Sequence, residues 1–298
     1  MGNGIVKRNL ICVVLTVSLM LVACTLAAKA PTKIVGQIVT ASWYEINSEI
    51  LGETRRYAVS LPVSYHQNPT KHYPVIYVLD GHEVRIKGVV GMLESLAHFD
   101  LSQQIPEFIV VAISSDNRNY DMTPSRSDLA FNGQVLQQMK DNSGGAGEFA
   151  DFIRLELFAE IDSQFRTNDS KGLVGMSLGG LLAADILINK PTMFSHYLIA
   201  DATYIWDDNY LNKTLLKLQS RLSKVKGKVF IALANNDHLG EVGLSNRKWG
   251  NDFIVNLKAV SNNQLKVSSK YFPTEQHGTV MYLAFYYGLI ELYSGNDA

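Results

Sequence analysis

The chain has 298 residues, of which 47% are hydrophobic and 18% charged, and its formal net charge is −1. This length and composition are typical of a globular protein with a sizeable core, built as one large domain or two small ones. The small net charge argues against a nucleic-acid partner, because such proteins usually carry a strong basic excess.

Residues 1–27 predict an export signal. Lys7 and Arg8 precede a mostly apolar run over 10–23. This run is short for a membrane span, which takes roughly 20 residues, and has the length of the apolar centre of a signal peptide. We therefore exclude it from the fold and assign residues 34–296 to a single domain.

The end of the signal allows two interpretations. The stretch LVAC, which ends at Cys24, resembles the bacterial lipobox, in which the cysteine is lipidated and becomes the mature N-terminus. Ordinary cleavage near Ala27 is the alternative. Either way we expect an exported protein of a Gram-negative bacterium, in the periplasm or attached to the outer membrane through Cys24.

Cysteine and metal chemistry are not expected in the mature protein. The only cysteines are Cys12 and Cys24, so no disulfide framework, cysteine nucleophile or cysteine metal site is available after the signal. The sequence contains no Walker loop and no H-E-x-x-H motif. We predict that the protein needs neither a metal ion nor another cofactor.

The rest of the chain alternates predicted strands and helices. Two strands rich in β-branched and aromatic residues come first, and buried strands and amphipathic helices then follow in turn. This order favours an α/β fold with a mostly parallel sheet, helices on both faces and two antiparallel strands at its start. The predicted strands are 33–46, 54–65, 73–81, 107–115, 171–177, 194–201, 228–237 and 266–273, and the predicted helices include 147–165, 178–190, 251–261 and 280–293.

A G-x-S-x-G motif places Ser177 between the strand 171–177 and the helix 178–190. In this context the motif presents a serine nucleophile on a sharp turn, with small neighbours that let strand and helix approach each other. The helix N-terminus adds a favourable partial positive charge. A glycine-rich turn with an idle serine is the alternative interpretation.

A general base is expected after the nucleophile in the chain. His277 follows the last predicted strand and precedes the last predicted helix, and Gly278 beside it leaves room for the ring. The other histidines lie before the nucleophile, within a predicted strand (His196) or at the end of an earlier strand (His238). We therefore predict His277 as the base.

The acid that orients the imidazole is less determined. Asp237 closely follows the strand 228–237, and Glu241 lies four residues further on. Asp201, at the end of the preceding strand, is a weaker option, and a site without an acid is also open. We favour Asp237, with Glu241 as the alternative.

Backbone N–H groups should form the oxyanion hole. Leu178 directly follows the nucleophile and supplies one donor. Gly81 or His82, in the loop after the strand 73–81, is expected to supply the other. Asp80 either braces this loop or belongs to a simple turn.

A substrate pocket is expected near the loop after the strand 194–201. Tyr204, Trp206 and Tyr210 could form an aromatic wall for an acyl or aryl group, although they suit plain packing equally well. Asp207 and Asp208 beside them would disfavour a strongly anionic substrate.

Five ordered stretches together resemble the esterase family of α/β-hydrolases, which includes feruloyl esterases, S-formylglutathione hydrolase, mycolyltransferases and siderophore esterases. The resemblance covers roughly residues 35–295 and is strongest to exported serine hydrolases near the siderophore esterases. The stretches are YPVIYVLDGHE, NRNYDMTPSR, GGAGEFADFIRLELFAEI, GLVGMSLGGLLA and EQHGTV.

The resemblance implies an α/β-hydrolase fold, with Ser177 as nucleophile and His277 as base. It aligns Asp237 on the acid, but the segment departs from the family pattern at Ala234, where a glycine is usual. In NRNYDMTPSR, it implies a bracing role near the site for Arg118, Asp121 and Thr123.

These observations predict a serine hydrolase that cleaves a small-molecule carboxylic ester through an acyl-enzyme, with siderophore or short acyl and aryl esters as candidate substrates. An acyltransferase on the same fold is one alternative, and a non-catalytic binding lipoprotein is another. The sequence leaves the oligomeric state open.

Overall fold

The computed structural model divides the chain into two compact units, Met1–Ile38 and Val39–Ala298. In the first unit only the irregular segment 33–38 is described, so the predicted signal and Cys24 lie outside the described residues. All elements named below belong to the second unit. The structure describes residues 33–98, 104–128, 140–261 and 263–295.

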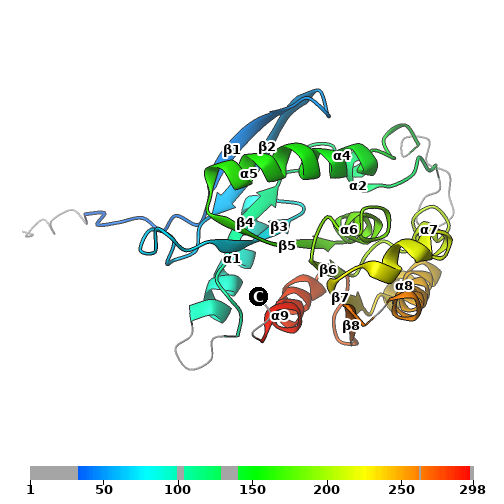
Figure 1. Cartoon of the computed structure of the whole chain (residues 1–298). Coiled ribbons are helices and arrows are strands. Elements are labelled where there is room, and N and C mark those ends of the chain that lie inside the picture. Colours follow the sequence, from blue (N-terminus) through cyan, green and yellow to red (C-terminus); the bar gives the residue numbers. More distant parts are fainter. Residues whose placement is uncertain (1–32, 99–103, 129–139, 262, 296–298) are drawn as a thin grey trace, which may run out of the picture. The chain divides into compact units, whose positions relative to one another are not determined.

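An eight-stranded sheet forms the centre of the second unit, in the order β1-β2-β4-β3-β5-β6-β7-β8 (Figure 1). The pairs β1–β2 and β2–β4 are antiparallel, and every other pair is parallel, as predicted. The strands are β1 (Ser42–Ser48), β2 (Glu53–Ser60), β3 (Tyr73–Val78), β4 (Ile109–Ile113), β5 (Thr167–Met176), β6 (His196–Ala200), β7 (Gly227–Ala234) and β8 (Leu265–Phe272).

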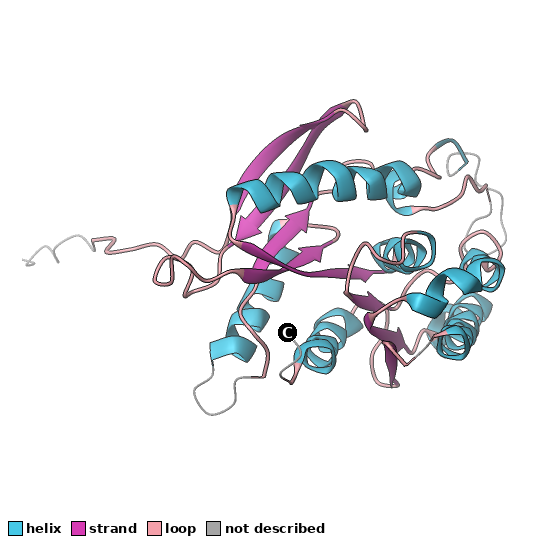
Figure 2. Cartoon of the chain, in the orientation of Figure 1, coloured by secondary structure: helices cyan, strands magenta, loops and turns pink. Residues whose placement is uncertain are grey.

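Helices cover both faces of this sheet (Figure 2). One face packs against α4 to α8, and the other packs against α1 and α9. The helices are α1 (Glu83–His98), α2 (Arg118–Met122), α4 (Ala146–Phe152), α5 (Phe158–Gln164), α6 (Leu178–Asn189), α7 (Tyr210–Leu218), α8 (Glu241–Val260) and α9 (Val280–Tyr293). A π-helical turn, Ile153–Leu157, joins α4 to α5.

The central strands are apolar along their whole length because both faces are covered. All six residues of β3 are buried. Val75 and Tyr77 pack on the face of α6, while Ile76 and Val78 pack on the face of α1 and α9. The two-residue period of a strand thus divides one short sequence between two cores.

Three neighbouring strands are each followed by a residue with a positive φ. Asp80 follows β3, Ser177 follows β5 and Asp201 follows β6, with φ values of 56°, 61° and 39°. Side chains other than glycine rarely adopt this left-handed region, and such strain is concentrated at functional sites. All three residues lie at the carboxyl edge of the sheet, where open α/β folds form their sites.

Some boundaries differ from the sequence prediction. The first strand begins at Ser42, and α8 begins at Glu241, ten positions before the predicted 251. The start of α8 is rich in glycine and polar residues, which hide its helical period. By contrast, α9 has the predicted bounds.

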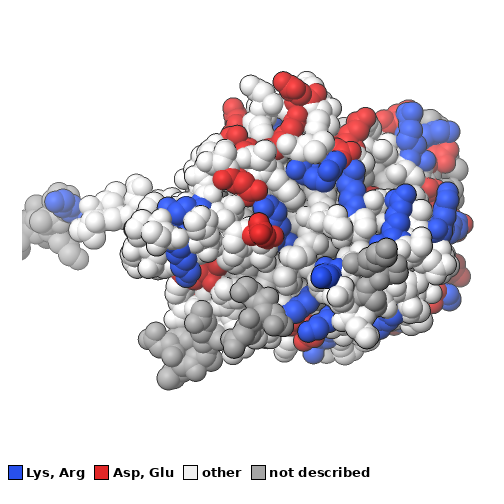
Figure 3. All heavy atoms as spheres, in the orientation of Figure 1, with Lys and Arg blue, Asp and Glu red and all other residues white. Residues whose placement is uncertain are grey.

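Basic and acidic side chains are interspersed on the face drawn in Figure 3. Of the helices within the described ranges, not one combines the length and the apolar character that crossing a bilayer requires.

Candidate active site

Ser177 lies on a sharp turn between β5 and α6, as the motif predicts. Its φ of 61° and ψ of −122° turn the chain directly from strand into helix. The glycines are needed for space: a Cβ at Gly175 would lie 2.2 Å from the Gly179 carbonyl oxygen, and one at Gly180 would lie 3.0 Å from the Ala202 Cα. The side chain of Ser177 is therefore presented at the strand end, half-buried.

His277 connects the serine to a buried carboxylate. It lies in the loop between β8 and α9, with its Nε2 3.0 Å from the Ser177 Oγ. Its Nδ1 lies 2.6 Å from the Asp201 Oδ2. Because a carboxylate only accepts hydrogen bonds, Nδ1 carries the proton and Nε2 is free to accept the serine hydroxyl proton.

Protein groups donate three hydrogen bonds to the Asp201 carboxylate. They take the place of water, because the side chain is only 2% exposed. The Ala234 N–H donates to its Oδ1 at 3.0 Å, and the Asn236 Nδ2 donates to its Oδ2 at 2.9 Å. With the imidazole as third donor, the carboxylate stays hydrogen-bonded without solvent, which offsets the cost of burying its charge.

The structure does not bring the favoured acid, Asp237, to the imidazole. Asp237 follows the strand end in a short 3₁₀ turn, and its carboxylate pairs with the Arg247 guanidinium while its side chain stays 50% exposed. The alternative, Glu241, is the exposed first residue of α8. The third candidate, Asp201, takes the place: it follows β6 with a left-handed φ, and its buried carboxylate contacts the imidazole.

The predicted oxyanion donors differ in their availability. Among the described residues the Leu178 N–H has no protein acceptor, as expected for the first residue of a helix. The Gly81 N–H donates to the Ile113 carbonyl oxygen at 2.8 Å, and the His82 N–H donates to the Asp80 carbonyl oxygen at 2.8 Å. Gly81 is fixed in place because a Cβ there would lie 2.6 Å from the Ala112 carbonyl carbon.

Two arginines brace the loop after β3. The Asp80 carboxylate accepts from the Arg118 Nε at 2.6 Å and from the Arg85 Nη1 at 3.0 Å. A Cβ at Gly179 would lie 3.3 Å from this carboxylate, so the ion cluster adjoins the serine turn.

The remaining residues of the NRNYDMTPSR stretch have structural contacts. Asp121 forms a buried, bidentate pair with Arg55. The Thr123 hydroxyl donates to the Asn119 carbonyl oxygen and accepts from the Gly144 N–H.

A cavity of about 240 Å³ opens beside the serine and the histidine. Its other walls are mainly apolar and come from the loop after β6 and from the region around the start of α8. The Asn246 amide is satisfied within the wall, since it donates to the Ala202 carbonyl oxygen and accepts from the Ile205 N–H. The lining residues are Ser177, Ala202, Thr203, Ile205, Asn236, Leu239, Val242, Gly243, Asn246 and His277.

The predicted aromatic wall is absent from the residues that line this cavity. Tyr204 and Trp206 are fully buried in the core, and the Trp206 Nε1 donates to the Ser125 Oγ. Tyr210 begins α7 and donates from its hydroxyl to Asp185, and burial raises the pKa of Tyr210 to about 12. Residues 204–209 form turns, within which Tyr204 and Trp206 belong to the core, while the half-buried Tyr210 packs against it.

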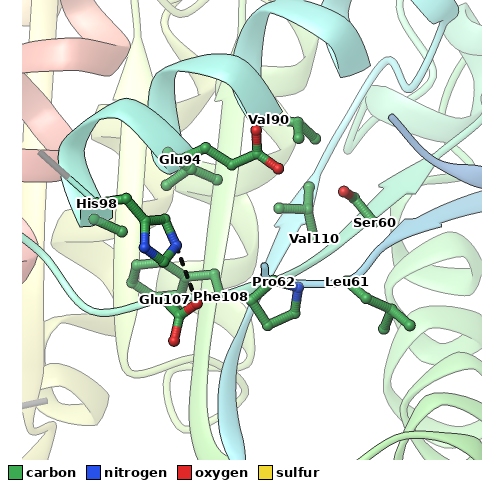
Figure 4. A pocket seen from close by; sticks show the side chains of 11 residues that line it. Ser60, Leu61, Pro62, Val90, Glu94, His98, Glu107, Phe108 and Val110 are labelled. Atoms are coloured by element: carbon green, nitrogen blue, oxygen red, sulfur yellow. Dashed lines mark ion pairs between the residues drawn. The ribbon is translucent and has the colours of Figure 1, made fainter. Parts of the chain in front are cut away.

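A second, much smaller cavity of about 20 Å³ lies between β2, β4 and α1 (Figure 4). There the His98 Nε2 lies 3.0 Å from a Glu107 carboxylate oxygen. Burial opposes ionisation of Glu107, but hydrogen bonds from Lys71 and Ser64 outweigh it and lower its pKa. The cavity is at the amino end of β4, opposite the serine, and has space for about one water molecule.

Sequence reasoning missed Asn236, whose amide contacts both the Asp201 carboxylate and the histidine loop. The one available signal is the pair of asparagines that follows β7, since asparagine side chains commonly bond nearby backbone at such ends. In the described part of the chain, no three histidine, cysteine or carboxylate side chains are grouped as metal ligands.

Comparison with known proteins places the chain in a family. The family model described as Putative esterase matches residues 48–238. The crystal structure of an IroE-like serine hydrolase from Shewanella oneidensis is 32% identical, with a TM-score of 0.78, over 85% of this chain and 80% of that one. Among curated proteins, ferri-bacillibactin esterase BesA of Bacillus subtilis is 24% identical over 77% of this chain and 82% of its own length.

A further curated relative, the uncharacterized protein YbbA of Bacillus subtilis, is 27% identical over 54% of this chain, and the match spans 62% of its length. The family match covers the serine turn, and the solved relative has the same fold over most of both chains. The chain therefore belongs to the esterase family of α/β-hydrolases, and its enzyme class is that of the carboxylic ester hydrolases.

Proposed function

We propose that the protein hydrolyses a small carboxylic ester through an acyl-enzyme on Ser177, with His277 as general base and Asp201 as the acid. The observation that carries this proposal is the continuous chain of contacts from a buried carboxylate through an imidazole to a hydroxyl, at 2.6 Å and 3.0 Å. This is the arrangement by which nucleophile, base and orienting acid are recognised, whatever their order in the sequence.

In the first step the Ser177 Oγ attacks the ester carbonyl carbon, and its proton passes to the His277 Nε2. The carbonyl oxygen becomes an oxyanion, which the Leu178 N–H stabilises. The His82 N–H serves as second donor once it turns from the Asp80 carbonyl oxygen, its acceptor in the structure, to the oxyanion. His277 then gives the proton to the leaving alkoxide oxygen, so that an alcohol departs and the acyl group stays on Ser177.

In the second step water replaces the alcohol. His277 takes a proton from the water, whose oxygen attacks the acyl carbon, and then returns this proton to the Ser177 Oγ as the acid is released. Throughout, the Asp201 carboxylate holds the tautomer with the proton on Nδ1 and stabilises the imidazolium.

The cavity supports a compact, uncharged acyl group as the part of the substrate that is bound beside Ser177. At about 240 Å³ it is just below the range of pockets that enclose drug-sized ligands, roughly 300–1,000 Å³, and its side chains are mainly apolar. Short aliphatic and single-ring aryl acyl groups suit this space. The similarity to ferri-bacillibactin esterase BesA adds siderophore esters to the candidates.

A panel of esters on the mature protein tests this proposal. We expect turnover of p-nitrophenyl acetate, butyrate and benzoate, poor turnover of the dodecanoate, and release of free acid and alcohol. A catecholate siderophore trilactone tests the larger candidate. A wild-type protein that turns over none of these esters would contradict the proposed activity.

We further propose that the protein is exported and attached to a membrane through Cys24. The proposal rests on the apolar run and the LVAC stretch of the sequence. Mass spectrometry of the mature N-terminus tests both parts: a lipidated Cys24 is expected. A free N-terminus near residue 28 would contradict the attachment, and an uncleaved signal would contradict the export.

A further inference from the structure

Two consecutive asparagines follow β7, next to the proposed catalytic residues. Asn236 is only 3% exposed, and Asn235 is half-buried. An amide side chain both donates and accepts, so each asparagine can join two different parts of the chain. A buried amide must also find partners for both its atoms, because an unpaired polar group is costly in the interior.

The Asn236 amide contacts both the acid and the histidine. Its Nδ2 donates at 2.9 Å to the Asp201 Oδ2, the same oxygen that accepts from the His277 Nδ1. Its Oδ1 accepts from the His277 backbone N–H at 2.8 Å. Only this orientation satisfies both contacts, since the carboxylate needs a donor and the backbone N–H needs an acceptor.

Asn235 ties the same loop to β7 by its backbone and its side chain. Its N–H donates to the Glu275 carbonyl oxygen at 2.7 Å, and its Nδ2 donates to the Pro273 carbonyl oxygen at 3.0 Å. His277 belongs to no strand or helix. The loop that carries it is therefore positioned by these hydrogen bonds.

Helix α8 holds Asn236 from the other side. Gly243 packs so closely that a Cβ there would lie 1.8 Å from the Asn236 carbonyl oxygen. The backbone of Asn236 is thus confined between α8 and the histidine loop, and its side chain has little freedom to leave the two contacts.

We infer that Asn236 is a positioning residue that sets the distance and direction between Asp201 and His277, with Asn235 anchoring the histidine loop. The inference rests on the proposed function, because it assigns a role within the proposed Ser177–His277–Asp201 relay. Asn236 acts through these two residues: it fixes one carboxylate oxygen and one backbone N–H, and so aligns the Nδ1–H with its acceptor.

Two substitutions of Asn236 test its hydrogen bonds in different ways. Asn236→Ala removes both hydrogen bonds. Asn236→Asp keeps the shape and the acceptor for the His277 N–H but sets a second carboxylate against Asp201, where like charges repel. Asn256→Ala is the matched control, because Asn256 also bonds through its amide, to Asn212 between α7 and α8, outside the site.

Three measurements report on the relay: kcat and KM on p-nitrophenyl butyrate, the rate at which a fluorophosphonate labels Ser177, and the downfield proton NMR resonance of the His277 Nδ1–H. For both Asn236 variants we expect kcat and labelling rate to fall about 10- to 100-fold, the range known for partners that orient metal ligands. The NMR resonance should shift or broaden, whereas Asn256→Ala should match the wild type.

The NMR resonance tests the positioning role separately from the proposed function, because recording the resonance requires no turnover of substrate. If the wild type neither hydrolyses esters nor reacts with the fluorophosphonate, the proposed function fails, and a resonance altered only in the Asn236 variants still supports the positioning role. An unchanged resonance and labelling rate in a folded Asn236→Asp or Asn236→Ala protein would overturn the inference.

Discussion

At the scale of single residues, the structure places one of two candidate aspartates, and not the other, against the imidazole of His277. Asp201 and Asp237 both lie near strand ends, yet only Asp201 is buried and bonded to His277. The difference comes from backbone direction: a left-handed turn follows β6, whereas Asp237 lies beyond two asparagines in an exposed turn.

Substituting each aspartate tests this assignment. Asp201→Asn should lower kcat by about 10⁴, because the amide favours the wrong imidazole tautomer. Asp237→Asn should change kcat by less than about threefold, since its half-exposed pair with Arg247 is worth little. The measurement is kcat on p-nitrophenyl butyrate, and the reverse order of the two effects would contradict the assignment.

The cavity wall should set which acyl group is accepted. Val242, on α8, lines the cavity, and Val242→Phe adds a ring to this space. We expect kcat/KM for the benzoate ester to fall at least about tenfold relative to the acetate ester, because the smaller acyl group still fits. Equal losses on both esters would indicate that this wall does not contact the acyl group.

At the scale of elements, the spacing of α8 from the site depends on one glycine. Gly243→Ala places a Cβ against the Asn236 carbonyl oxygen, so helix and loop must separate. We expect a loss of about 1–3 kcal/mol in the free energy of unfolding, together with a lower kcat.

Gly91→Ala, in α1, is the matched control, because a Cβ there meets nothing within 4 Å. Alanine should stabilise this exposed helix position by about 0.5–1 kcal/mol. Urea unfolding of both variants gives the two free energies, and a Gly243→Ala protein as stable as the wild type would show that α8 can move freely.

The elements were largely predictable, and the reason is their apolar content. The buried strands are short, continuous apolar runs and α9 is a long apolar one, so their places follow from the sequence. The start of α8 lacks such a run. The partner of His277 and the burial of Trp206 depend on turns after β6, where φ rather than residue type decides the direction of the side chains.

At the scale of the whole molecule, one buried histidine links stability to pH. His196, in β6, stacks on Tyr293, and burial lowers its pKa to about 4, with a further contribution from the charge of Lys228. Between about pH 6.5 and pH 4 the unfolded chain therefore binds a proton that the folded protein does not. Stability is lost as the pH falls through this range.

Replacing this histidine should remove that loss. His196→Phe keeps a ring against Tyr293. Between pH 6.5 and pH 4 its free energy of unfolding should fall less steeply than that of the wild type, and the two slopes should differ by up to about 1.4 kcal/mol per pH unit. Urea unfolding at a series of pH values measures it. The same steepness in both proteins would contradict a neutral, buried His196.

The most direct test of the catalytic account is to trap the acyl group during turnover. Acid quench of the enzyme with a slowly hydrolysed p-nitrophenyl benzoate, followed by peptide mass spectrometry, should find the benzoyl group on Ser177. Ser177→Ala should carry no adduct and lose about 10⁶ in kcat. An acyl group on another residue, or full activity in Ser177→Ala, would contradict the account.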